Sequence, residues 1–179
     1  LNQTLHRSIE AAHTARTLRR VFPEGPHFAH HAPLPGGQAM SDEGAANHTR
    51  LHAGGEGPGV HFFVYGRSAS GRPTALPPPK HYPARQTLEA SEAVARLHQL
   101  DPARTVFAQQ NPAVIDEGVF HNDVIAVGHE QVLLYHERAF AEGERTIQHL
   151  SQALGGRLIP VRIDADELSV SDAVGSYLF

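Results

Sequence analysis

The residues of this sequence with the clearest chemical potential are an imidazole and a carboxylate two positions apart, His121 and Asp123. They come just before a short apolar run at 124–127, which we predict to be a β-strand. Residues i and i+2 of an extended chain point to the same face. A polar pair at the mouth of a buried strand is costly unless it is satisfied or used. We therefore predict that His121 and Asp123 line one wall of an active site.

A second carboxylate, Glu43, stands between Asp42 and Gly44 in the stretch SDEGAANHTRL at 41–51. Glycine allows the backbone there to approach a ligand closely. A histidine can serve as general acid and base in turn near neutral pH, and a carboxylate can bind a cation through charge-assisted hydrogen bonds. We expect the Glu43 carboxylate and the His121 ring on the same side of one sheet or barrel wall, within reach of one small ligand, with Asp123 facing the same space. Without further context, Glu43 could be a solvated loop acid and His121 a histidine at a hairpin edge.

Composition and charge exclude several classes of function. The 179 residues include 15 Lys and Arg against 19 Asp and Glu, a formal charge of −4, so we predict no nucleic-acid partner. Cysteine is absent, which removes disulfides, thiolate metal sites and cysteine nucleophiles from this chain. The apolar runs are strand-sized and the first residues, LNQTLHRSIE, show no signal pattern, so we predict no membrane span and a cytoplasmic location.

The elements that position these residues follow from hydrophobic periodicity and from Gly and Pro boundaries. We predict strands at 60–65, 105–108, 124–127, 132–135 and 158–163, and helices at 3–22, 85–100, 138–154 and after Ser169 or Ser171. Residues 128–131 form the turn of a central hairpin, and the Pro- and Gly-rich connection 66–83 is predicted to be flexible. The apolar stripes of the helices are predicted to be core.

The order strand, strand, helix, strand occurs at 121–163, and a looser copy occurs at 43–109. We read this as two successive ββαβ units in an α/β protein. Such a repeat cannot bury its apolar face alone and normally needs neighbours. We therefore expect 1–179 to be a middle piece of one larger domain.

Fourteen histidines invite a metal-binding alternative. His48 and His52 have i, i+4 spacing, which on a helix would put both on one face, and with His121 they could form a zinc hydrolase site. However, glycines follow at 54 and 55 and no acidic ligand has a fixed place. We therefore predict no metal site, and we interpret the histidines at 27, 30 and 31 as surface residues.

Six stretches together resemble the N-succinylarginine dihydrolase family of the guanidine-modifying (pentein) superfamily. They are His6-Arg7, SDEGAANHTRL at 41–51, FFVYGR at 62–67, YPARQTLEASEAVARL at 82–97, FAQQNPAVIDEGVFHNDVIAV at 107–127 and SVSDAVGSYLF at 169–179. The resemblance implies a five-bladed β/α propeller, of which this chain would hold about two blades and would be truncated at both ends. It implies hydrolysis of N2-succinylarginine to N2-succinylornithine, ammonia and carbon dioxide in arginine catabolism. It also implies no cofactor, a small-molecule substrate, and a homodimer at full length.

The resemblance assigns roles residue by residue. It implies that Glu43 and His121 are catalytic, and that substrate contacts come from four residues, His6, Arg7, Arg85 and Asp123. The nucleophilic cysteine and a substrate-binding asparagine would lie beyond Phe179. His129 departs from the family pattern, which has asparagine after that glycine.

Arg85 is predicted in the first turn of the helix 85–100, where a cation is mildly unfavourable, so a ligand carboxylate would explain it. Because the chain has no cysteine, a catalytically inactive fragment remains an alternative to a working enzyme.

Overall fold

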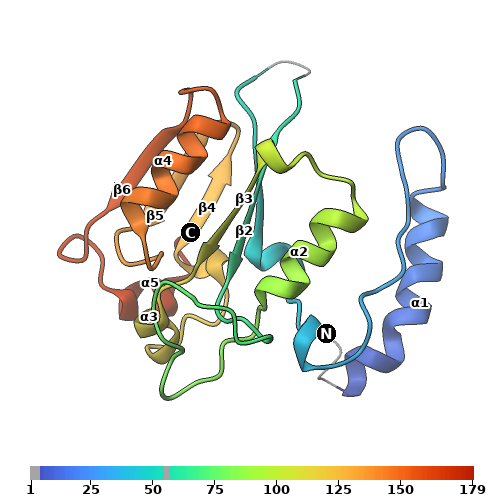
Figure 1. The fold of residues 1–179 in the computed structure, drawn as a ribbon, viewed down its shortest axis with the longest axis horizontal. Coiled ribbons are helices and arrows are strands. Elements are labelled where there is room, and N and C mark those ends of the chain that lie inside the picture. The colour runs from blue at the N-terminus through green and yellow to red at the C-terminus, as the bar shows by residue number, and fades with distance from the viewer. Residues whose placement is uncertain (1–4, 55–56) are drawn as a thin grey trace.

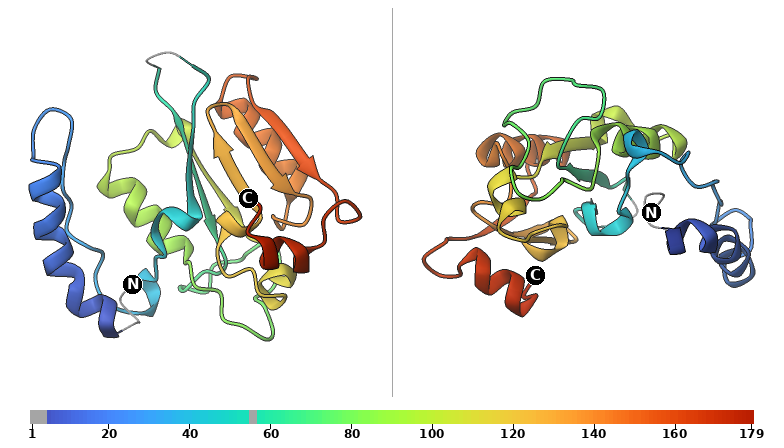
Figure 2. Two further views of the ribbon diagram at one scale, coloured as in Figure 1. Left: turned by 180° about the vertical axis from the view of Figure 1, so that it is seen from behind. Right: turned by 90° about the horizontal axis from the view of Figure 1, so that it is seen from below.

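The structure, a computed structural model, describes residues 5–54 and 57–179, with side chains from Ile9 onward. Two three-stranded sheets stand side by side (Figures 1 and 2). The first holds β1 (His48–Leu51), β2 (Val60–Tyr65) and β3 (Thr105–Gln109), and the second holds β4 (Ala126–His129), β5 (Val132–His136) and β6 (Ile159–Ile163). No helix among the described residues is long and apolar enough to cross a bilayer.

Both sheets have the same connectivity. In each one, the first two strands are antiparallel and the second and third are parallel. Parallel neighbours need a crossover connection, which α2 (Leu88–Leu97) makes in the first unit and α4 (Gly143–Ala153) in the second. The prediction of two ββαβ units in an α/β protein is therefore confirmed.

A single apolar core joins the two units. It includes Leu51, Phe62 and Val64 of the first sheet together with Leu133 of β5 and Leu150 of α4. The strands β1 and β4 pack against each other where the sheets meet. Gly128 permits this approach, because a Cβ there would lie 2.5 Å from the Thr49 Cγ2 atom.

Some element boundaries differ from the predictions. The helix predicted at 85–100 begins only at Leu88, because the Thr87 hydroxyl caps it by accepting the Ala90 N–H. The strand predicted at 124–127 begins at Ala126, since the preceding residues form the short 3-10 helix η4 (Asn122–Val124). The turn shortens to Glu130 and Gln131, with Glu130 in the left-handed region at φ 53°.

The elements not yet described are one long helix, which is the first in the chain, and several short ones. They are η1 (Gln38–Met40), η2 (Gly44–Asn47), η3 (Pro102–Arg104), α3 (Pro112–Asp116) and α5 (Val170–Ser176), and the first helix is α1 (Leu5–Val21). Ser169 caps α5, because its hydroxyl oxygen accepts the Asp172 N–H. Ser169 is one of the two residues after which the sequence predicted this helix to begin.

The connection 66–83 is anchored at both ends by carboxylates. Glu89 accepts backbone N–H groups of Ala69 and Ser70, and Asp116 accepts those of Lys80, His81 and Tyr82. These contacts hold the ends of a segment whose composition predicts flexibility.

The apolar side chains of α1 from Ile9 onward do not join the core. Figures 1 and 2 show this helix standing away from both sheets. Ile9 is 71% exposed, Val21 is 61% exposed, and Leu18 is exposed as well. The prediction that its apolar stripe is core is therefore wrong for the described side chains of this helix.

Candidate active site

Glu43 and His121 occupy similar places in the two units. Glu43 is the N-cap residue of η2, which leads directly into β1. His121 is the N-cap residue of η4, which leads into β4 after one intervening residue. Each side chain therefore projects from the turn that precedes the first strand of its own unit, and the packing of β1 against β4 brings these turns together.

The two side chains meet. The His121 Nε2 atom lies 3.1 Å from the Glu43 Oε2 atom, although the residues are 78 positions apart in the sequence. An ionised carboxylate can only accept, so Nε2 must carry the proton of this hydrogen bond. The side chains are 23% and 14% exposed, which leaves them open to a ligand while reducing the screening of their charges. The predicted proximity of Glu43 and His121 is confirmed.

A buried glutamine holds the backbone at Glu43. The Gln86 Oε1 atom accepts the Glu43 N–H at 2.7 Å, and its Nε2 atom donates to the Asp42 Oδ1 atom at 2.9 Å and to the Ser91 Oγ atom at 3.1 Å. Gln86 is 5% exposed, so these bonds are largely shielded from water. The residue just before the N-cap of α2 thereby fixes the segment that carries the catalytic candidate Glu43.

A buried asparagine links the two turns. The Asn47 Oδ1 atom accepts the backbone N–H of Asn122 at 2.9 Å, and Asn122 directly follows His121. Sequence reasoning found neither Asn47 nor Gln86, because the hydrogen-bond partners of a buried amide are set by tertiary contacts and not by a local pattern. Only their places inside two motifs, next to His48 and Arg85, pointed toward the site.

Arg85 lies beside the segment that carries His121. Its position is not explained by the helix terminus that the sequence analysis invoked. It precedes the N-cap Thr87 and is therefore outside α2, so the argument from an unfavourable helix terminus is wrong. Its guanidinium carbon stands 4.6 Å from the centre of the Phe120 ring, a cation–π contact next to His121. The exposed Arg85 side chain thus remains available to an anionic ligand.

The predicted geometry of Asp123 is wrong in its premise. Asp123 lies inside η4, so the alternation of an extended strand does not govern the direction of its side chain. It is exposed. His6 and Arg7 belong to α1, and their side chains lie outside the described part of the structure.

The histidines do not form the predicted alternative zinc site. His48 begins β1 and His52 follows that strand, so no helix presents the two on one face. The His48 Nε2 atom is 3.0 Å from the His61 Nδ1 atom. Within residues 5–54 and 57–179, no three histidines or carboxylates converge as a metal-binding group.

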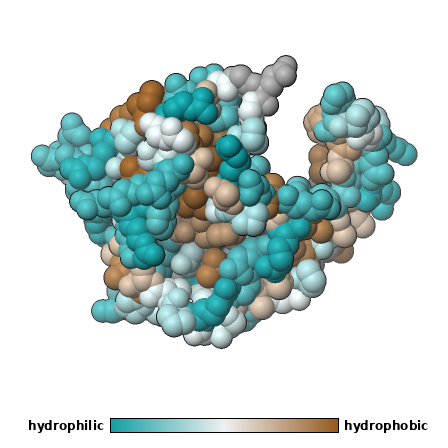
Figure 3. Space-filling view, turned by 45° about the horizontal axis from the view of Figure 1, so that its top comes forward, coloured by the Kyte–Doolittle hydropathy of each residue, from teal (hydrophilic) through white to brown (hydrophobic). Residues whose placement is uncertain are grey.

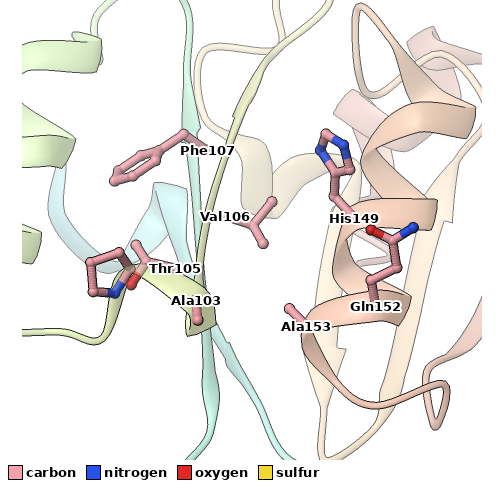
Figure 4. A pocket seen from close by; sticks show the side chains of 8 residues that line it. Ala103, Thr105, Val106, Phe107, His149, Gln152 and Ala153 are labelled. Carbon is pink, nitrogen blue, oxygen red and sulfur yellow. The ribbon is translucent and has the colours of Figure 1, made fainter.

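Two surface hollows lie elsewhere on the molecule. One, of about 390 Å³, lies between β3 and α4, where Val106 points toward the helix that carries His149 and Gln152, whereas the Phe107 ring points to the other side of β3 (Figure 4). The other, of about 360 Å³, lies next to it and shares His149. In the view of Figure 3, apolar surface gathers in the hollowed centre of the molecule between hydrophilic margins. Neither hollow is lined by Glu43 or His121.

Comparison with known proteins gives the family. The family model described as succinylarginine dihydrolase matches residues 1–179. The chain belongs to the succinylarginine dihydrolase family. It is 55% identical over 179 residues to the N-succinylarginine dihydrolase of Chromohalobacter salexigens, and 56% identical over 182 residues to that of Pseudomonas savastanoi pv. phaseolicola. All of this chain is covered in both alignments, against 39% and 40% of the relatives.

A relative from Photorhabdus laumondii shows the same relationship. It is 50% identical over 182 residues, which cover 100% of this chain and 40% of the relative. The chain therefore spans about 40% of the length of these N-succinylarginine dihydrolases. The family resemblance stated from the motifs is confirmed.

Proposed function

We propose that this chain supplies the guanidinium-binding and acid–base part of an enzyme that hydrolyses N2-succinylarginine in arginine catabolism. The products would be N2-succinylornithine, two molecules of ammonia and carbon dioxide. The observation that carries the proposal is the hydrogen bond between His121 Nε2 and Glu43 Oε2, 3.1 Å long and partly buried. The names of the relatives support the choice of substrate.

The residue types suit the substrate. A guanidinium group is a planar cation, and the carboxylates of Glu43 and Asp123 would bind it through charge-assisted hydrogen bonds. His121 would protonate the departing ammonia and then activate water. Proton transfer by a positioned side chain contributes roughly 10²–10⁴ in rate. Arg7 and Arg85 would bind the two carboxylates of the substrate, with His6 as a further contact. No metal or cofactor is needed for these steps.

The nucleophile would come from outside these residues. Water attacks the resonance-stabilised guanidinium carbon slowly, and a thiolate divides the barrier by forming a covalent intermediate. The 179 residues contain no cysteine. We propose that the thiolate belongs to a further part of the same domain, in which the two ββαβ units would be two of five propeller blades. We propose a cytoplasmic homodimer as the working form of that protein.

The test is ammonia release from N-succinylarginine by the full-length protein, meaning a protein of the relatives' length that contains these 179 residues. His121→Ala should chiefly lower kcat, because proton transfer is lost while most contacts remain. Glu43→Gln should raise KM and lower kcat, since one charge that binds the cation is removed. His129→Ala is the matched control, an exposed histidine in the hairpin, and should behave as the parent. Full turnover by His121→Ala would exclude the proposed acid–base role.

A further inference from the structure

Asn47 and Asn122 form a buried link between the two turns that carry the catalytic candidates. Asn47 ends η2 and Asn122 begins η4, and each is only 2% exposed. The Asn47 Oδ1 atom accepts the Asn122 N–H at 2.9 Å. This bond joins the same two turns as the hydrogen bond between Glu43 and His121.

We propose that Asn47 is a positioning residue, which sets the distance between Glu43 and His121 through the backbone of Asn122. The inference rests on the proposed function, in which those two side chains act on one guanidinium group. Asn47 lies four residues after Glu43, and Asn122 directly follows His121. A bond between Asn47 and Asn122 therefore fixes the backbone on both sides of the pair.

The backbone N–H of Asn122 is a buried donor. Removal of the Asn47 acceptor would leave the Asn122 N–H buried without its partner, which is more costly than the loss of an exposed hydrogen bond. The turn η4 would relieve this by moving toward another acceptor or toward water. The His121 ring would move with the backbone, and a displacement of about 1 Å can cost roughly 100-fold in rate.

The Asn122 side chain, which takes no part in this bond, provides a matched control for the Asn47 side chain. Asn47 Nδ2 and Asn122 Oδ1 are both buried without a hydrogen-bond partner among the described residues. Asn122 uses only its backbone N–H in the link, so Asn122→Ala deletes an equally buried side chain of the same size and leaves the link intact. Asn47→Ala removes the acceptor itself.

The experiment compares these two variants in the full-length protein by steady-state ammonia release from N-succinylarginine. Asn47→Ala should lower kcat by roughly 10- to 100-fold with little change in KM, because bound substrate meets a displaced acid–base group. Asn122→Ala should lose much less kcat than Asn47→Ala, because the backbone N–H of residue 122 keeps its bond to Asn47. Equal losses of kcat in the two variants, or a parental kcat in Asn47→Ala, would overturn the proposal.

A double-mutant cycle separates positioning from general packing. If Asn47 acts through His121, then Asn47→Ala should cause no further loss in a protein that already carries His121→Ala. A full additional loss in that background would show that Asn47 acts elsewhere. Asn47→Leu, which keeps the volume but lacks the acceptor, replaces Asn47→Ala if the smaller side chain prevents folding.

Hydrogen exchange tests the link without any variant and without turnover. The Asn122 amide of the parent protein should exchange slowly, because it is buried and bonded to Asn47. Rapid exchange at Asn122 in a folded protein would overturn the proposal. A parent protein that releases no ammonia from N-succinylarginine, yet protects the Asn122 amide, would instead count against the proposed function alone.

Discussion

Acidification should weaken this fold through His48. The pKa of His48 is lowered from 6.5 to about 4, first by burial of the ring and then by the neighbouring His61 and His98, against an opposing effect of Asp42. The ring stacks on Phe63 with centroids 4.2 Å apart. Protonation would place a poorly hydrated charge in this setting, on a ring whose Nε2 atom lies 3.0 Å from the His61 Nδ1 atom.

The sign of the effect follows from proton binding in the two states. Between pH 6.5 and about 4, the unfolded chain holds a proton on His48 and the folded protein does not. The free energy of unfolding must therefore fall as the pH drops through this window, and it levels off below the folded pKa. The full difference in pKa corresponds to about 3 kcal/mol. Because His48 is only half-buried, water screens its charge, and we expect a loss of about 1–2 kcal/mol.

Urea unfolding of the purified protein, followed by circular dichroism at pH 7.5 and 4.5, measures this loss. Since other groups also titrate, the informative quantity is the difference between parent and variant. His48→Asn should lose about 1 kcal/mol less than the parent between the two pH values. His129→Asn, the exposed hairpin histidine, should lose as much as the parent. An unchanged pH dependence in His48→Asn would refute the reasoning.

Three other expectations concern the site and the junction of the two units. Gln86→Leu should lower both kcat and the thermal midpoint, because the part-buried Glu43 N–H loses its acceptor, which costs about 1–3 kcal/mol; a parental midpoint would contradict this. Gly128→Ala should lower the free energy of unfolding by about 1–3 kcal/mol, since the new Cβ would lie 2.5 Å from the Thr49 Cγ2 atom. Gly175→Ala is the control, because a Cβ there would meet open space and should cause no such loss. The 179-residue chain alone should release no measurable ammonia from N-succinylarginine, because it lacks a thiolate; turnover by this cysteine-free chain would disprove the covalent mechanism.

The order of the elements could be predicted from the sequence because its determinants are local. Apolar runs such as 60–65 and 132–135 are bounded by glycine and polar residues, and they became β2 and β5. Repetition of strand, strand, helix and strand predicted the two ββαβ units. The motifs around Glu43 and His121 indicated the family and the chemistry.

Only the tertiary structure decided how these groups meet. The sequence does not encode locally that η2 and η4 pack together, so the 3.1 Å approach of Glu43 to His121 depends on the junction of β1 and β4. For the same reason, the supporting roles of Gln86 and Asn47 were invisible in the sequence. Local reasoning also failed at Asp123 and in α1. There, a 3-10 turn replaced the extended chain, and the apolar face lies away from both sheets. Backbone propensity and periodicity are properties of neighbouring residues, whereas the geometry of the site is set by contacts that close over many residues when the two units share one core.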